Sequence, residues 1–201
     1  MSGWIDADYV GAAFNGKDLS EVEFVHSKFT RCRFIGTRLT EAKAENCRFE
    51  ECDFSGARMN AATFSDTSFA NSTFRGAHFF LTRFERCRLI GASFVEADLG
   101  GLVVVESDWS WAILRHQNLE GAELRGTKLV EADLDEANLK KADLRQTDLT
   151  RANLQHARLT GADLRGANLT QVDLRGLDLR GVRLNVEHAI LLAQCYGAKV
   201  E

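Results

Sequence analysis

The chain has 201 residues, with 25 basic and 29 acidic side chains and a formal net charge of −4 at pH 7. This acidic balance argues against direct binding of nucleic acid through neutralised phosphates. No apolar run approaches the roughly 18 residues that span a bilayer, and the opening MSGWIDADYV is no signal peptide, so we expect a soluble cytoplasmic protein without a membrane partner.

A five-residue period runs without interruption from Trp4 to Leu184. Of the 37 positions that it marks, which we call the large series, 19 are Leu, 12 are Phe and the other six are also apolar. A small series, mostly Ala, Cys, Ser and Thr, lies two positions before each of them. Because the period fits neither a strand nor a helix, it predicts a repeat architecture.

We expect four five-residue units to close one coil of 20 residues, with both series pointing inward. Thirteen of the 16 glycines lie two residues after a large-series position, where a corner needs backbone freedom. At a coil spacing of ~4.8 Å, the period gives about nine coils and a rod about 43 Å long. The sequence therefore predicts an all-β solenoid, a quadrilateral β-helix, over residues 1–184.

Three inward positions break this pattern. Ala44 is small for the large series and predicts a local void or an inward shift of its neighbours. Lys17 and Gln117 stand in the small series, so we expect their corners to open or their polar ends to reach solvent.

Chemically reactive residues give no catalytic or metal motif. Four cysteines occupy the small series and are predicted to be buried thiols without a metal or redox role, while the role of Cys195 stays open; the four are Cys32, Cys47, Cys52 and Cys87. His116 and His156 share a face but lie two coils apart, too far to share a metal. The chain also lacks a Walker loop, a dinucleotide fingerprint and a nucleophile elbow. We expect no enzyme activity, no cofactor and no metal.

One face of the expected coil carries an acid in every turn. Consecutive acids would lie ~5 Å apart along the rod, which resembles the spacing of a phosphate strand. The alternative is an ordinary solvated face, because arginines follow the last three acids by two residues and would neutralise them. The acidic ladder comprises Asp6, Glu23, Glu45, Asp66, Glu85, Glu106, Glu123, Asp143 and Asp163.

Several large apolar residues fall at outward positions. They indicate either a surface for a protein partner or tolerated surface exposure. These residues are Phe80, Leu81, Val103, Val105 and Trp111.

The period ends at Leu184, and residues 185–201 predict a capping or dimerisation helix and a tail. Asn185 stands at the expected helix start and Gly197 at its end. The helix has more apolar surface than a cap needs, which favours a symmetric dimer over a monomeric cap. The predicted dimer interface comprises Val186, Ala189, Ile190, Leu192, Ala193 and Tyr196.

The repeat unit resembles A(D/N)LXX, the unit of the pentapeptide repeat proteins, at Ala132–Leu134, Ala142–Leu144 and Ala162–Gly166. This resemblance implies a right-handed quadrilateral β-helix. The segments 4–6, 18–20, 101–119 and 179–184 are similar to the MfpA/Qnr-type fluoroquinolone-resistance group, although the unbroken period lacks the projecting loops of plasmid-borne Qnr proteins.

Members of that group bind DNA gyrase, imitate duplex DNA and dimerise through the C-terminal helix. The resemblance implies a DNA mimic that inhibits gyrase, protects it from quinolone-type poisons, or does both, with topoisomerase IV as a second candidate target. The alternative is a non-enzymatic scaffold that binds a different protein.

Overall fold

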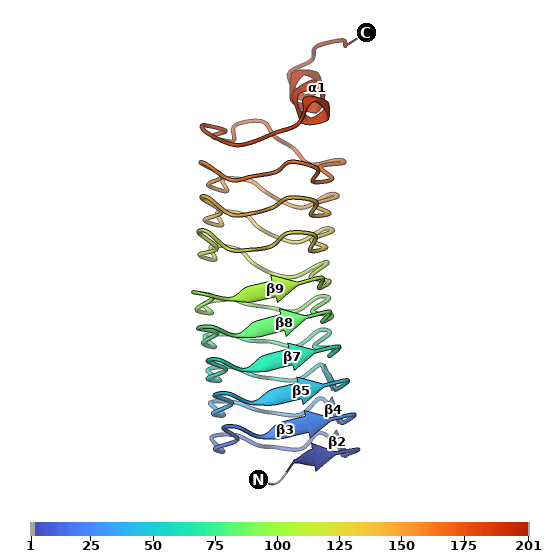
Figure 1. The fold of residues 1–201 in the computed structure, drawn as a ribbon, viewed down its shortest axis with the longest axis vertical. Helices are drawn as coiled ribbons and strands as arrows, with labels where there is room; N and C mark the ends of the chain where they lie inside the picture. Colours follow the sequence, from blue (N-terminus) through green and yellow to red (C-terminus); the bar gives the residue numbers. More distant parts are fainter. Residues whose placement is uncertain (1–2, 201) are drawn as a thin grey trace.

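The computed structural model describes residues 3–200 as a β-solenoid that carries one short helix at its C-terminal end (Figure 1). Successive coils stack in parallel with a spacing of 20 residues, from Trp4 opposite Phe24 to Asp163 opposite Arg183. The predicted all-β solenoid and its 20-residue coil are therefore confirmed.

The strands lie in the first half of the rod, and parallel pairing continues beyond them as isolated bridges. One six-stranded sheet contains β1 (Trp4–Ile5), β3 (Glu23–Val25), β5 (Lys43–Glu45), β7 (Thr63–Ser65), β8 (Arg83–Glu85) and β9 (Val103–Val105). A three-stranded sheet contains β2 (Asp8–Val10), β4 (Lys28–Thr30) and β6 (Arg48–Glu50).

Stacked aromatic rings fill the first half of the core. Phe34, Phe54 and Phe74 belong to one column, with ring centroids 4.7 and 5.2 Å apart. Ala44 interrupts another column, because it lies in register between Phe24 and Phe64. Ala44 is itself buried, and the void expected beside it stays a prediction.

The corners adopt left-handed backbone conformations. Glycines supply many of them, as predicted, but 23 other residues also have positive φ, for example His116 at 59°. This conformation costs a residue with a Cβ roughly 1 kcal/mol or more. The inter-coil hydrogen bonds at the corners hold these residues in place.

The two long polar residues of the small series, Lys17 and Gln117, differ in their exposure to solvent. Lys17 is exposed, with its Nζ 5.3 Å from the centre of the Phe14 ring, as expected. For Gln117 the expectation was wrong, because its side chain is buried and its Oε1 has no hydrogen-bond partner.

Four cysteines are buried in the small series, and all five are free thiols. Burial raises the pKa of Cys52 and of Cys87 to about 12, and it also raises the pKa of Cys47. The thiols of Cys47, Cys52 and Cys87 therefore stay protonated at neutral pH and act as small apolar residues. Cys195 is partly buried in the C-terminal helix and packs against the core.

The helix α1 (Val186–Cys195) covers the last coil with one side only. Leu191, Leu192 and Cys195 pack against the core, and His188 is buried with its Nε2 2.7 Å from the carbonyl oxygen of Ala167. This spacing of three and four residues forms a stripe that faces the solenoid.

Asn185 and Gly197 bound the helix as expected, the glycine in a left-handed conformation with φ of 84°. The Asn185 side chain makes no cap hydrogen bond and instead donates to the Glu187 carboxylate. The start of the helix therefore depends on packing rather than on a side-chain cap.

Candidate functional site

The acidic ladder lies on one face of the solenoid but in three different columns. Glu23, for example, pairs in register with Lys43, and Glu85 pairs with Val105. Seven basic residues occupy the same columns and leave the nine acids with a net charge of −2: Lys43, Arg83, Arg86, Arg125, Arg145, Arg165 and Arg183. The ladder is therefore not a strip of nine free charges.

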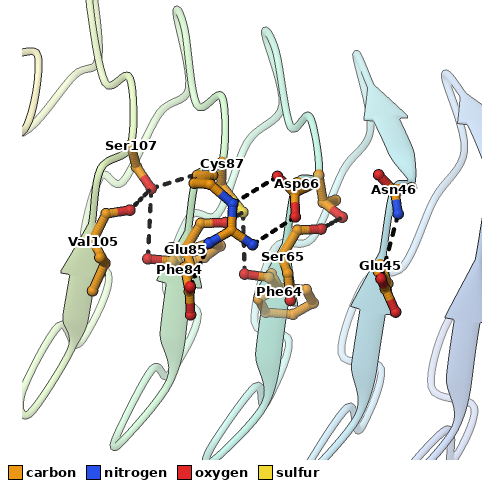
Figure 2. Close-up of polar contacts among 12 residues, drawn as sticks. Glu45, Asn46, Phe64, Ser65, Asp66, Phe84, Glu85, Cys87, Val105 and Ser107 are labelled. Carbon is orange, nitrogen blue, oxygen red and sulfur yellow. Dashed lines mark hydrogen bonds and ion pairs between the residues drawn. The ribbon is translucent and has the colours of Figure 1, made fainter.

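Arginines hold the middle of the ladder in ion pairs. Asp66 and Glu85 lie on neighbouring coils, as Figure 2 shows, and both accept hydrogen bonds from Arg86. Arg83 also contacts Glu85, at 3.1 Å. The hydrogen bonds from Arg86 lower the pKa of both carboxyls, so both stay ionised.

Two of the last three acids of the ladder, Asp143 and Asp163, are neutralised by the arginine two residues later, as the alternative interpretation expected, whereas Glu123 is not. Arg145 contacts Asp143 at 2.5 Å, and Arg165 contacts Asp163 at 2.7 Å. The hydrogen bond from Arg165 lowers the pKa of Asp163 to about 2. Such pairs give orientation to the side chains but leave little net field.

The lowered pKa of Asp163 predicts that the folded protein loses stability in acid. Because the folded pKa of Asp163 lies below its usual value of 3.8, the pair stabilises the fold above about pH 4, and the contribution is lost as the pH falls towards 2. Asp163→Asn and Arg165→Gln should each flatten the decline of Tm between pH 5 and pH 2. Thermal melts followed by circular dichroism measure this decline, and wild-type slopes in both variants would contradict the assignment.

Three acids of the ladder have no ion pair among residues 3–200: Glu45, Glu106 and Glu123. Glu45 accepts only a 3.5 Å hydrogen bond from Asn46, and these two residues are labelled in Figure 2. Arg125 bonds Gln146, at 3.0 Å, instead of neutralising Glu123. Glu106 and Glu123 line one shallow surface depression. Arg125 and Arg145 line the same depression, so these two carboxylates are unpaired but not remote from basic groups.

The outward apolar residues lie in separate places on the surface. Phe80 and Leu81 are more than half exposed and lie at one corner, while Val103 and Val105 are half-buried in β9. Gly101 lies at the same corner as Leu81, one coil further along the rod. Trp111 is 55% exposed, but it follows Gly101 by ten residues and therefore lies half a coil away from this corner. The predicted patch is therefore not continuous.

The C-terminal helix lies at the end of the rod (Figure 1), and several of its apolar residues are not covered by the solenoid. Val186, Ala189 and Ile190 are exposed, Val186 at 73%. Tyr196 is 68% exposed but lies just beyond α1, and its hydroxyl accepts a 3.5 Å hydrogen bond from the Gly176 amide of the solenoid. Ala193 is half-buried, and Leu192 packs against the core instead of joining the exposed residues. The predicted interface thus narrows to the residues that the solenoid leaves uncovered.

Two features were missed by sequence reasoning. One is His188, which is buried and attaches the helix to the solenoid. Its spacing of three and seven residues from Leu191 and Cys195 is the signal in the sequence that it shares their face of the helix. A histidine and two carboxylates also meet at one corner: Asp135, Glu136 and His156. The signal was the column Glu96, His116, Glu136 and His156, whose members are 20 residues apart. A carboxylate thus lies between the two histidines of this column and brings a second kind of metal ligand to the corner.

Within residues 3–200, no helix has the length and apolar character required to cross a membrane. The described helix, α1, has ten residues.

Solved structures provide the first comparison with known proteins. Two trypsin-treated variants of QnrB1, a plasmid-mediated fluoroquinolone resistance protein, are each 25% identical to this chain. One has a TM-score of 0.90 and coverage of 100% of both chains, and the other has 0.89 with 98% of this chain and 99% of that chain. HetL, involved in heterocyst differentiation regulation in the cyanobacterium Nostoc sp., has a TM-score of 0.58 at 21% identity, over 89% of this chain and 87% of its own, and shares the fold alone.

No match was found among curated protein sequences. Two family profiles match instead. The profile of pentapeptide repeats matches residues 68–101, 110–146 and 147–185, and that of a pentapeptide repeat region matches residues 22–82. Both profiles describe the five-residue period that builds the coils, and the chain belongs to the pentapeptide repeat family.

Proposed function

We propose that this protein is a non-enzymatic DNA mimic that binds DNA gyrase and inhibits it, protects it from quinolone-type poisons, or does both. The observation that carries the proposal is the end-to-end similarity to QnrB1, with a TM-score of 0.90 over the whole of both chains. A right-handed, quadrilateral rod of about nine coils would be about 43 Å long at ~4.8 Å per coil. Topoisomerase IV, which also binds duplex DNA, is a second target to test.

The unpaired acids Glu45, Glu106 and Glu123 would meet the basic surface on which gyrase holds DNA. Duplex DNA of the same length would carry about 25 charges at one per ~1.7 Å, far more than the ladder supplies. Charge therefore assists encounter and orientation, and the shape of the rod supplies most of the complementarity. Such a partner places the protein in the cytoplasm.

A second candidate function is a scaffold for a different protein, favoured by the exposure of Phe80 and Leu81. This corner would bind an apolar surface without any need for the acids. Loss of the partner on substitution of Phe80, with unchanged binding to gyrase, would support it.

Charge reversal separates these proposals. The triple variant Glu45→Lys, Glu106→Lys and Glu123→Lys should bind purified gyrase about fivefold to 100-fold more weakly, since each lost charge pairing costs a few tenths to 1 kcal/mol at a surface. Biolayer interferometry at low and at 0.5 M salt measures this loss, which should shrink at high salt.

The matched control reverses three acids of the adjacent face, Asp8, Glu50 and Glu51, and makes the same change in net charge. This control should retain binding. Equal losses in the two triple variants would show that net charge alone matters and would remove the acidic ladder from the account.

A further inference from the structure

One corner of the solenoid brings a histidine between carboxylates of successive coils. Donor atoms of Asp135, Glu136 and His156 all lie within 4.8 Å of one another. His156 Nδ1 is 3.1 Å from an oxygen of Asp135. His116, one coil before Glu136, places its Nδ1 3.3 Å from the Glu136 carboxylate. The corner therefore holds three groups able to coordinate one metal ion, and His116 contacts one of them from the preceding coil.

The backbone of this corner is fixed by the stacking of the coils. The amides of His116 and Glu136 donate to carbonyl oxygens of the next coil, at 3.0 and 2.8 Å. The backbone of His156 has the same left-handed conformation as these two residues. Ligands on such a frame need only side-chain rotation to close around an ion, which is the arrangement expected of a preorganised site.

Arg115 holds the least exposed of these groups. Its guanidinium contacts one oxygen of Asp135 at 2.5 Å, and the other oxygen faces His156. The Asp135 side chain is only 9% exposed. An outer partner that grips one carboxylate oxygen orients the other towards a metal.

The local charge suits a cation. Asp133, Asp135 and Glu136 supply three negative charges, while Arg115 is shared between both aspartates. Arg158 lines the same surface depression as Glu136 and His156 and supplies the second positive charge. The balance of −1 favours a divalent ion over an anion.

The contact distances match those between ligands of one ion. Around a tetrahedral zinc ion, with bonds of about 2.1 Å, neighbouring ligand atoms are about 3.4 Å apart, close to the 3.1 Å between His156 Nδ1 and the Asp135 carboxylate. The exposed side chains of Glu136 and His156 can rotate to shorten the remaining separations. A mixed nitrogen and oxygen donor set suits zinc and its first-row neighbours better than magnesium or calcium.

We propose that Asp135, Glu136 and His156 bind a divalent first-row transition-metal ion such as Zn²⁺, with water completing the coordination. Within each 20-residue coil, Glu136 and His156 occupy the sixteenth position, whereas Asp66 and Glu106 of the acidic ladder occupy the sixth. The two positions are half a coil apart, so this site lies at the opposite corner of the solenoid. Metal binding here is independent of the proposed interaction with gyrase.

Isothermal titration of the untagged chain with ZnCl₂ tests the site. We expect saturable binding of one ion per chain, weakened about tenfold or more in Glu136→Gln and in His156→Gln. The matched control is His78→Gln, because His78 is similarly exposed but faces a single carboxylate, that of Asp98 at 3.9 Å. This control should bind zinc as the wild type does.

A second readout separates coordination from loose surface attraction. Zinc should raise the Tm of the wild type and of His78→Gln but not that of His156→Gln, and circular dichroism without metal verifies that every variant is folded. Absence of saturable binding, or wild-type affinity in His156→Gln, would overturn the proposal and leave these contacts as ordinary ion pairs.

Discussion

Phe54→Ala is expected to destabilise the rod by about 3–5 kcal/mol, the usual cost of removing a buried aromatic side chain. Phe54 is 1% exposed, and its ring stacks on those of Phe34 and Phe74 at 4.7 and 5.2 Å. It also meets Phe49 and Phe69 edge-on. Each coil of a solenoid is supported only by its neighbours, so the cavity weakens contacts on both sides.

Urea unfolding followed by circular dichroism measures this effect. Arg58→Ala is the matched control, because Arg58 is exposed on the next unit of the same coil and has no ion pair among residues 3–200. The control should change the free energy of unfolding by no more than about 0.5 kcal/mol. A loss below about 1 kcal/mol for Phe54→Ala would mean that the aromatic stack does not hold the coils together.

Ile190→Asp is expected to convert a dimer into a monomer. The exposed stripe of α1 contains Val186, Ala189 and Ile190 and lies on the side that the solenoid does not cover. We propose that the same stripe of a second copy covers it in a symmetric pair. A carboxylate at its centre would be buried without a partner, which costs more than the surrounding apolar contacts supply.

Light scattering after size exclusion measures the change, which should be from twice 22.4 kDa to 22.4 kDa. The control Val10→Asp introduces the same charge at an exposed valine near the other end of the rod and should remain dimeric. A wild type that is monomeric at all concentrations tested would refute the proposed interface and leave α1 as a simple cap.

The five-residue period was sufficient to predict the solenoid, because it assigns every residue an inward or outward position. The fate of Gln117 was not predictable in the same way. A long polar side chain in the small series can turn outward, as that of Lys17 does, or remain enclosed, and the outcome depends on the packing of adjacent coils.

The pairing of charged side chains was harder to predict from the sequence than the fold was. The repeat placed Asp66 and Glu85 on the correct face. It did not predict that Arg86 neutralises both, because Arg86 lies one coil beyond Asp66 and directly follows Glu85 in the chain. Similarly, α1 has two apolar stripes, and helical spacing alone could not decide that His188, Leu191 and Cys195 face the solenoid. Contacts between coils settle both questions.

Gyrase supercoiling, with the purified protein titrated in and with or without a fluoroquinolone, tests the central claim most directly. Our account predicts dose-dependent inhibition of supercoiling, relief of drug-stabilised cleavage, or both, at concentrations where the protein is dimeric. The unpaired acids should be required for either effect. Unchanged supercoiling and unchanged cleavage throughout the titration would contradict the account and direct attention to a different partner at the Phe80 corner.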